Sequence, residues 1–430
     1  MNLEPIKVVY NWIGPTGPMI NTEVPSVLDL SKQVMSSDVV MEKNYFHERL
    51  WLSLFNNAET FQLTSAFELI SGDAKATFIY PLQMDWRLHY APYFMSKQGI
   101  LEFSRCHQQV IDWVRNGNGY FLLDLSHESF VSDHELSIME SYFITLSIPL
   151  DKIIYVTGCP NARLIQERRM KTYNRSIHVV TYPAGVHSAH AEIKNKPLCT
   201  RSNLIPSKLF LSWNRRFRIH RTVMALLMLK HKLLDLTYLS MPMTDPTGTP
   251  ITFNTHCEEI LWIIKLFDIT DEEVAKFNLM VPLELDNPPE IFDAVNNIES
   301  NRRYYEDSLI SIVTETKCDH EIVSLTEKTT KPIQNMHPFI IVGSPGSLLA
   351  LRELGFRTFN AFWDEGYDCA RDYVTRIKMI ISVCNDIAAW DDEKKAKFIK
   401  DSEEIVQHNY RILQKNPNLS TVKRIVEIVS

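Results

Sequence analysis

The chain has 430 residues, of which 45% are hydrophobic and 23% charged, and its formal net charge is −7. This composition is typical of a globular protein with two or three domains, and it excludes a disordered, collagen-like or coiled-coil chain. The excess of acidic over basic residues argues against nonspecific nucleic-acid binding by the chain as a whole. With only 13 glycines, the sequence contains neither a Walker-type phosphate loop nor a GxGxxG fingerprint.

No stretch approaches the 18 or more apolar residues of a membrane span, and no signal peptide is recognisable. We therefore expect a cytoplasmic protein that makes no membrane contact. The seven cysteines form no CxxC pair, so we expect reduced thiols and no zinc site.

In the first half of the chain, apolar runs alternate with amphipathic stretches. A strand over residues 6–12 leads into the turn-rich Gly14-Pro15-Thr16-Gly17-Pro18. Further strands are predicted over residues 119–125, 152–157 and 177–181, and the intervening helices over 100–115 and 133–146. Such alternation indicates parallel βα units. Gly14, Thr16 and Gly17 form a candidate cleft loop, which its two prolines should make stiff.

Two carboxylates lie at the junction where the strand over residues 119–125 ends. Asp124 and Glu128 flank Ser126 and His127 in the sequence DLSHE. Either they face a ligand at the carboxyl edge of the sheet, or Asp124 and Ser126 cap the following helix. The residues by themselves leave both interpretations open.

A polar stretch over residues 191–207 predicts a linker, after which the strand and helix pattern restarts. Strands are predicted over 208–212, 309–314 and 338–342, and helices over 220–234, 326–336 and 348–354. The last forty residues are helical, with apolar residues at sevenfold spacing that favour packing on the parent fold over a coiled coil. We predict an α/β protein with domains at residues 1–200 and 205–390 and C-terminal helices at 391–430.

An arginine-rich loop follows the strand over residues 208–212. It has the sequence SWNRRFRIHR and lies between the end of a predicted parallel strand and the start of a helix. Ligands of open α/β sheets bind at such places, and arginine matches the oxygens of a diphosphate. The alternative is a solvated charged loop. The candidate anion-binding residues are Asn214, Arg215, Arg218 and Arg221.

A second polar cluster follows the strand over residues 309–314. Thr314-Glu315-Thr316 is followed by the sequence SLTEKTTKPI, in which Thr326 is placed to cap a helix. Glu327 and Lys328 then fall in the first turn, while Pro332 predicts a kink or a later helix start. These residues could serve only to cap the helix, or they could bind a ribose diol and a phosphate.

Taken together and in this order, the two clusters resemble the nucleotide-sugar-binding domain of α-1,3-fucosyltransferases. The resemblance rests on FLSWNRRFRIHR, SLISIVTET, SLTEKTTKPI and PFIIVG. Uncharacterised phage and giant-virus proteins classed as glycosyltransferases are similar over TEKT-KPI, PF-I-GSPG, L-LGF-TF and DE-YD. The likeness covers residues 208–368. It implies a GT-B-like arrangement, in which two Rossmann-like domains face a cleft and the C-terminal helices pack back on the fold.

The resemblance also implies roles for individual residues. Glu327 would bind the donor's ribose, Lys328 the diphosphate, and Arg218 or Arg221 would assist, with Asn214, Arg215, Glu315 and Thr326 around them. Such enzymes invert the anomeric centre without a metal or resident cofactor, and the sequence lacks the DxD signature of metal-dependent transferases. One departure is Thr314-Glu315-Thr316, where the fucosyltransferases carry Glu-Asn-Ser, and this leaves the donor sugar open.

The general base of an inverting transfer is expected from the N-terminal domain, with Glu128 preferred and Asp124 in reserve. The acceptor hydroxyl would belong to a modified DNA base or to a glycan, in the host cytoplasm if the chain is viral. A basic segment is compatible with DNA and equally with a solvated helix face. Its residues are Arg163, Arg168, Arg169, Lys171 and Arg175.

Two alternatives remain at the level of sequence. The chain could be a non-catalytic sugar-nucleotide-binding or virion-associated protein with the same fold. His187, His190 and Glu192 could bind a metal, a hypothesis that rests only on their short spacing in a polar loop.

Overall fold

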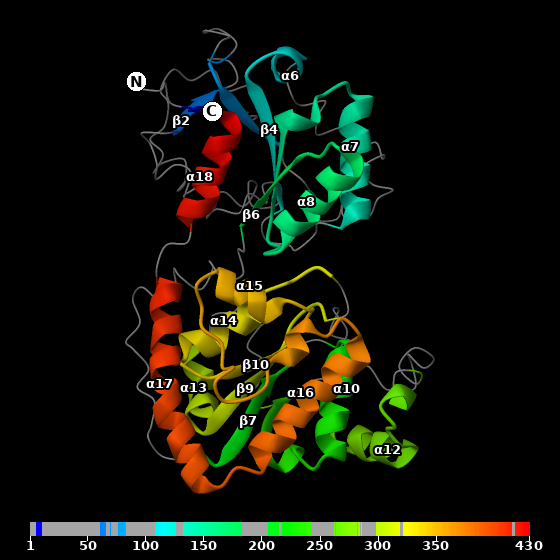
Figure 1. Ribbon diagram of the computed structural model, residues 1–430, viewed down its shortest axis with the longest axis vertical. Helices are drawn as coiled ribbons and strands as arrows, with labels where there is room; N and C mark the ends of the chain where they lie inside the picture. The colour runs from blue at the N-terminus through cyan, green and yellow to red at the C-terminus, as the bar shows by residue number, and fades with distance from the viewer. Residues whose placement is uncertain are drawn as a thin grey trace, which may run out of the picture. The chain divides into compact units, whose positions relative to one another are not determined.

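The computed structural model describes residues 6–10, 61–65, 69, 76–82, 108–125, 132–182, 205–214, 217–241, 262, 264–281, 283, 285, 298–318, 321–414 and 418–430. The chain divides into two compact units (Figure 1). Unit 1 comprises Met1–Ala184 and Pro417–Ser430, and unit 2 comprises Gly185–Asn416. The predicted C-terminal region at 391–430 is therefore shared between the two units.

Unit 1 contains a six-stranded sheet in which every neighbouring pair of strands is parallel. The strand order is β2-β1-β3-β4-β5-β6. The strands predicted near residues 6, 119, 152 and 177 are confirmed, whereas β2 and β3 were not predicted. The strands are β1 (Ile6–Tyr10), β2 (Phe61–Ser65), β3 (Phe78–Leu82), β4 (Gly119–Leu125), β5 (Ile153–Thr157) and β6 (His178–Thr181).

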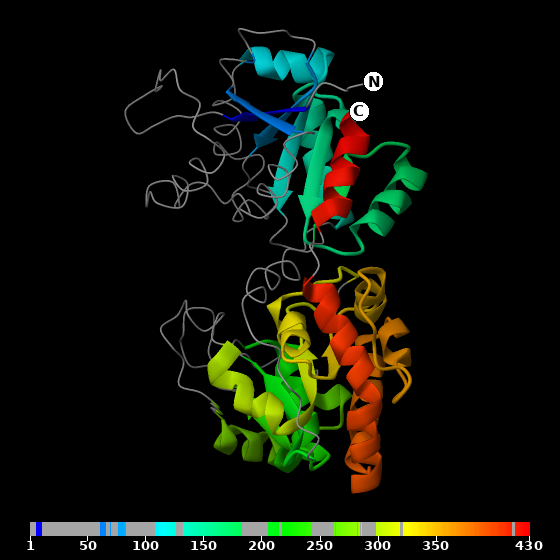
Figure 2. The same cartoon turned by 90° about the vertical axis from the view of Figure 1, so that its left-hand side faces the viewer.

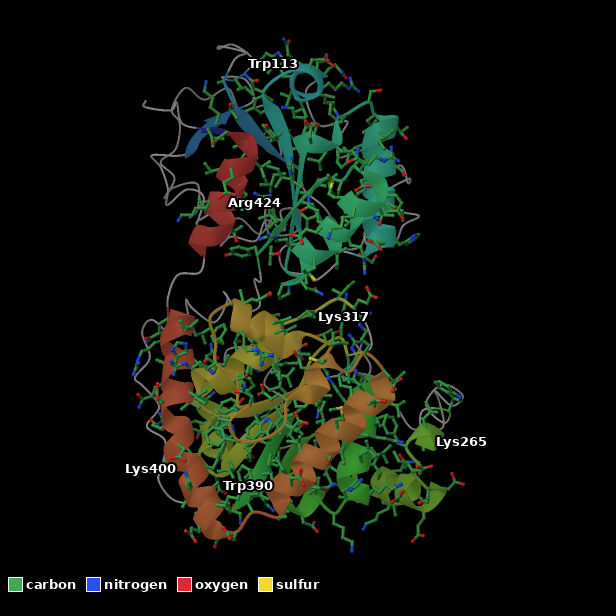
Figure 3. All side chains as sticks on the ribbon, viewed as in Figure 1. Trp113, Lys265, Lys317, Trp390, Lys400 and Arg424 are labelled. Atoms are coloured by element: carbon green, nitrogen blue, oxygen red, sulfur yellow. The ribbon has the colours of Figure 1, made fainter. Side chains whose placement is uncertain are left out.

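Helices of unit 1 pack on this sheet, among them α6 on β4 and α8 on β6. Ser132 and Glu135 form a capping box at the start of α7, where each side chain bonds the backbone N–H of the other residue. Trp113, labelled in Figure 3, lies edge-on to Phe78 with ring centroids 6.3 Å apart. The elements are α6 (Gln108–Asn116), α7 (Asp133–Thr145), the 3-10 turn η2 (Leu150–Lys152), α8 (Ala162–Tyr173) and α18 (Asn418–Val429).

Helix α18 brings the end of the chain back to the sheet of unit 1. Val422, Ile425 and Val429 are buried in one cluster with apolar residues of the sheet, among them Leu122 and Val156. Figure 2 shows the helix lying along the strands. The sheet of unit 1 is thus covered by a helix that is distant from it in sequence.

Unit 2 contains a four-stranded parallel sheet in the order β10-β9-β7-β8. All seven residues of β9 are buried, as expected for a strand covered on both faces. The predicted strands of this half are confirmed, and β8 is an additional one. The strands are β7 (Lys208–Trp213), β8 (Thr237–Ser240), β9 (Ser308–Thr314) and β10 (Phe339–Val342).

Two groups of helices surround the sheet of unit 2. Helix α10 packs with α12 and α16, while α14 packs with α17 and α13 packs on β9. Figure 1 shows α10 and α16 on the opposite side of the sheet from α13, α14 and α17. The elements are α10 (Ile219–Lys230), η3 (Leu234–Leu236), α12 (Asp271–Met280), α13 (Ile298–Glu306), α14 (Glu327–Gln334), α15 (Ser347–Glu353), η6 (Gly366–Cys369), α16 (Tyr373–Ala388) and α17 (Asp392–Gln414).

Helix α17 carries the sevenfold apolar pattern, and its apolar side packs into the core of unit 2. Phe398, Val406 and Leu413 are buried there, and the Trp390 ring lies 5.3 Å from the Phe398 ring. Packing on the parent fold is thus confirmed. Among the described residues, no helix has the length and apolar character needed to cross a bilayer. The predicted α/β class, with two parallel sheets and returning C-terminal helices, is also confirmed.

Candidate functional site

The strand order of unit 2 places the two polar clusters side by side. The first strand of the unit, β7, lies between β8 and β9, so the connections that leave β7 and β9 run in opposite directions. In open parallel sheets, ligands bind outside the carboxyl ends of the strands at such a switch point. Asn214 follows β7 there, and Glu315 follows β9.

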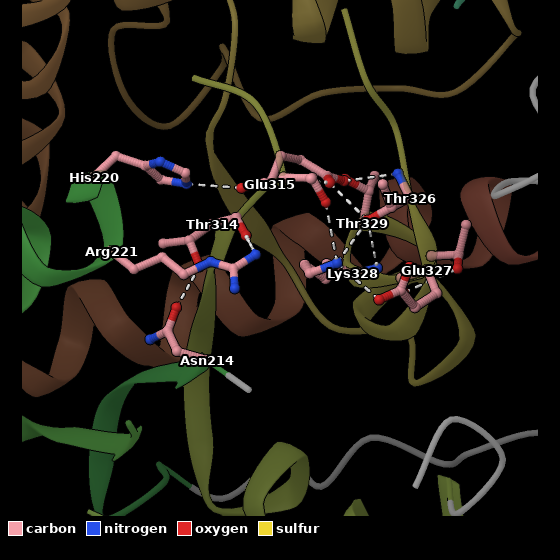
Figure 4. A network of polar contacts seen from close by, with 11 residues as sticks. Asn214, His220, Arg221, Thr314, Glu315, Thr326, Glu327, Lys328 and Thr329 are labelled. Atoms are coloured by element: carbon pink, nitrogen blue, oxygen red, sulfur yellow. Dashed lines mark hydrogen bonds and ion pairs between the residues drawn. The ribbon is translucent and has the colours of Figure 1, made fainter. Parts of the chain in front are cut away.

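Direct hydrogen bonds join the ends of the two strands (Figure 4). The Thr314 hydroxyl donates to Asn214 Oδ1, and Asn214 Nδ2 lies 3.3 Å from the Ser212 hydroxyl. From the start of α10, His220 Nε2 lies 2.7 Å from the backbone oxygen of Glu315, and Arg221 donates to the backbone oxygen of Thr314. The end of β9 is therefore attached to both β7 and α10.

The side chain of Glu315 has no exposed surface and accepts four hydrogen bonds. Oε1 accepts from the Thr326 N–H at 2.9 Å and from the Thr329 hydroxyl at 2.6 Å. Oε2 accepts from the Thr326 hydroxyl at 2.6 Å and from the Thr316 N–H at 3.2 Å. The carboxylate thus connects the end of β9 to the start of α14.

Helix α14 begins as the sequence predicts. Thr326 is its N-cap, with extended backbone and a hydroxyl that accepts from the Lys328 N–H at 3.3 Å, and Glu327 lies in the first turn. Of the two alternatives predicted from Pro332, the later start is wrong, because the helix begins at Glu327 and includes Pro332. A proline this deep removes one helical hydrogen bond, and the helix ends two residues later at Gln334.

The ammonium group of Lys328 lies at this helix start among oxygen atoms. Nζ is 2.7 Å from Glu327 Oε1, 3.2 Å from the Thr326 hydroxyl and 3.5 Å from the Thr316 hydroxyl. The Lys328 side chain is 21% exposed and that of Glu327 is 42% exposed, so both can be reached from solvent. A cation and hydroxyls beside a helix N-terminus favour a phosphate or another anion.

The carboxylate of Glu327 is held in its ionised form. Burial acts to raise its pKa, but the neighbouring Lys328 and Lys331 ammonium groups lower the pKa to about 2. Glu327 therefore carries its charge at neutral pH. An ionised carboxylate accepts hydrogen bonds from two hydroxyls, as a ribose diol would require.

We expect this charge to add stability that disappears only in acid. The pKa of Glu327 is lower in the folded chain than the ordinary value of 4.5, so its contribution is present above about pH 4.5 and is lost as the pH falls toward 2. Thermal unfolding should give wild type a higher melting temperature than Glu327→Gln. The difference between the two should be constant from pH 7 to 5 and should disappear from pH 4.5 to 2.5. A difference that disappeared between pH 7 and 5 would contradict the lowered pKa.

Several expected ligand contacts are buried in the protein. Asn214, Arg221 and Glu315 are each at most 3% exposed, and their side chains bond to strands and helices of unit 2. These three residues hold the site together instead of facing a ligand. Arg218, the N-cap of α10, has a partly exposed side chain, and Arg215 lies outside the described residues.

The candidates in unit 1 are only partly described. The backbone of Asp124 lies near the carboxyl end of β4, paired with Val156 of β5. Glu128 lies outside the described residues, as do Gly14, Thr16 and Gly17 of the candidate cleft loop. The choice between Glu128 and Asp124 as the base therefore stays a prediction.

The basic segment lies on and just after α8, and the structure changes its interpretation. Arg169 is 2% exposed and forms an ion pair of 2.7 Å with the buried Glu140 of α7. Arg163 pairs with Glu167 on the helix surface. Arg169 is therefore a structural residue that cannot contact a phosphate backbone, and the case for a DNA-tracking surface is correspondingly weaker.

Sequence analysis missed residues that support the site and overlooked the role of the acidic DE-YD pattern. His220, Thr316 and Thr329 all contact Glu315 or Lys328. They lie within the two polar segments that the sequence singled out, but nothing in the local pattern marked them as supports of the site. Asp368 accepts from the N–H groups of Leu348 and Leu349 at 2.9 and 3.0 Å. It caps α15, so that helix terminus is already occupied by a carboxylate.

In the described part of the chain, no group of three or more His, Cys, Asp or Glu side chains could hold a metal ion. The candidate group of His187, His190 and Glu192 lies outside that part. The hypothesis of metal-independent chemistry thus stays a prediction.

The geometry defines an open, parallel α/β protein with a polar site at the switch point of its second sheet. No protein-family model and no curated protein matches the chain. Solved structures that resemble it include a DNA-modifying β-glucosyltransferase crystallised with and without uridine diphosphoglucose, at 10% identity, 99% coverage of both chains and a TM-score of 0.40. A trehalose-6-phosphate synthase matches at 10% identity, with 99% of this chain and 98% of that chain covered and a TM-score of 0.42.

A UDP-forming trehalose-phosphate synthase from Burkholderia xenovorans matches 91% of this chain and 80% of its own, at 9% identity and a TM-score of 0.40. Likenesses at these identities and TM-scores do not assign an activity to this chain.

Proposed function

We propose that the chain is a glycosyltransferase that moves a sugar from a nucleotide-diphosphate sugar to a hydroxyl acceptor, with inversion and without a metal. The observation that carries the proposal is the cluster of Lys328, Glu327 and two threonine hydroxyls at the start of α14. This cluster lies at the switch point of a parallel sheet, where nucleotide ligands bind in open α/β folds.

Each side chain has a defined part in the proposal. Lys328 binds the diphosphate, and the partly exposed Arg218 is preferred over the buried Arg221 as the second cation. Glu327 accepts hydrogen bonds from the ribose hydroxyls. Fixed cations stabilise the charge that develops on the diphosphate as it leaves, and this lowers the barrier most in a site that is already organised.

In the proposed reaction, the acceptor oxygen attacks the anomeric carbon as the bond from that carbon to the diphosphate oxygen breaks. The bonding electrons remain on the nucleoside diphosphate, and the acceptor's proton passes to a carboxylate. Glu128 is the preferred base and Asp124 the reserve. The acceptor classes are a modified DNA base and a glycan.

A ligand screen tests this proposal. Thermal unfolding is measured with GDP, UDP, ADP, CMP and TDP and their sugars, with and without EDTA. A nucleotide at a hundred times its Kd should add about 2.7 kcal/mol of stability, and EDTA should not change the effect. Slow release of the same nucleoside diphosphate from its sugar would show turnover.

The screen has two contrary outcomes. Stabilisation without turnover, even with DNA or glycan acceptors, would favour a non-catalytic sugar-nucleotide-binding protein. If none of the nucleotides stabilises the chain, the donor-site assignment is wrong.

A further inference from the structure

The carboxylate of Glu315 has all of its acceptor positions filled by the protein itself. A carboxylate offers about four lone-pair positions, and Glu315 receives four hydrogen bonds at 2.6 to 3.2 Å. The side chain is also completely buried. Glu315 therefore cannot serve a ligand as a hydrogen-bond acceptor, and its charge must act through its neighbours.

The neighbour that matters most is the Thr326 hydroxyl. A hydroxyl has one proton to donate and two lone pairs that accept. The proton of Thr326 goes to Glu315 Oε2 at 2.6 Å. The lone pairs are thereby turned toward Lys328, whose N–H lies at 3.3 Å and whose Nζ lies at 3.2 Å.

The backbone around Glu315 is fixed from two sides, which makes the carboxylate a rigid support. The Glu315 N–H donates to the backbone oxygen of Val342 in β10 at 3.0 Å. The backbone oxygen of Glu315 lies 2.7 Å from His220 Nε2. Gly343 follows Val342, and a Cβ there would lie 2.9 Å from the Ser347 hydroxyl and 3.6 Å from Glu315 Cβ. A side chain at position 343 would therefore crowd the Ser347 hydroxyl and come into van der Waals contact with Glu315.

We propose that Glu315 is a positioning residue: through the Thr326 hydroxyl it orients the Lys328 ammonium for the diphosphate of the donor. This inference rests on the proposed function. It assigns the buried carboxylate a role in binding that requires no contact with the ligand. The relay runs from Glu315 to Thr326 and then to Lys328, as Figure 4 shows.

A double-mutant cycle tests the relay. The Kd of the stabilising nucleoside diphosphate is measured for wild type, Glu315→Gln, Lys328→Ala and the double variant. Each single change should weaken binding at least tenfold. The double variant should bind no more weakly than Lys328→Ala, because without Lys328 the relay has nothing to position. The coupling would then be tenfold or more, or about 1.4 kcal/mol.

Glu365→Gln is the matched control in the same unit. Glu365 is also a buried carboxylate, and it accepts from the Thr358 hydroxyl at 2.7 Å and the Phe359 N–H at 2.8 Å. Its replacement should lower the melting temperature but leave the Kd within twofold of wild type. An unchanged Kd in Glu315→Gln, or additive effects in the cycle, would overturn the proposal.

A second pair of measurements separates this inference from the proposed function. Thr326→Val retains the N–H that bonds to Glu315 but removes the hydroxyl of the relay, so it should show the same coupling with Lys328 even if Glu315→Gln fails to fold. If no nucleotide binds the wild type, amide hydrogen exchange of the free protein tests the relay. Exchange over residues 326–330 should rise at least tenfold in Glu315→Gln and stay unchanged in Glu365→Gln, and equal exchange in both would refute the relay.

Discussion

Lys328→Ala should lose the stabilisation by nucleoside diphosphate and reduce turnover about 10² to 10³-fold, the usual cost of removing one preorganised donor from a developing anion. The structure places the Lys328 ammonium group 2.7 Å from Glu327 Oε1 and among the hydroxyls at the start of α14. Melting curves with and without nucleotide, together with turnover, measure the effect. Lys328→Arg should retain part of the binding because it preserves the charge.

Lys397→Ala is the control for charge removal. Lys397 forms an ion pair with Asp401 on the surface of α17, and its side chain is 74% exposed. Such pairs contribute about 0 to 1 kcal/mol, so this variant should match wild type in stability and binding. Nucleotide binding by Lys328→Ala at wild-type affinity would place the diphosphate elsewhere.

Ile425→Ala should destabilise unit 1 by about 2 to 5 kcal/mol, the range for deleting a buried aliphatic side chain. Ile425 of α18 has no exposed surface and lies in the cluster that covers the sheet. Amide hydrogen exchange in β4–β6 should accelerate, while exchange in β7–β10 should change little. Exchange is the suitable measurement because a chain with two units need not unfold in one step.

Ile428→Ala is the matched control on the same helix. Ile428 is only partly buried against this cluster, so the same deletion should cost less than half as much. Equal effects of the two changes, or equal acceleration in both units, would show that α18 does not hold the sheet of unit 1 as the structure indicates.

Local patterns in the sequence were sufficient to predict the strands that have long apolar runs. The predicted limits of β4 are those observed, and the Thr326 cap of α14 was also predicted. Strand β3 was missed because it contains Pro81, which cannot donate to a neighbouring strand. In the described pairing, β3 bonds to β1 only at Phe78 and Ile79, so Pro81 lies beyond that contact and opposite Leu122 of β4.

The sequence by itself determined the α/β class, most of the strands and the residue types of the site, because these follow from short-range spacing and composition. Only the tertiary structure decided that Arg221 and Glu315 are buried while Arg218 and Lys328 reach solvent. Three of the four donors to Glu315 belong to Thr326, the N-cap of α14, and to Thr329 in its first turn. Arg221 bonds to β9, some ninety residues later in the chain. Which side chain faces a ligand depends on the order of the strands and the direction of their crossovers. The local pattern of residues predicts neither of these.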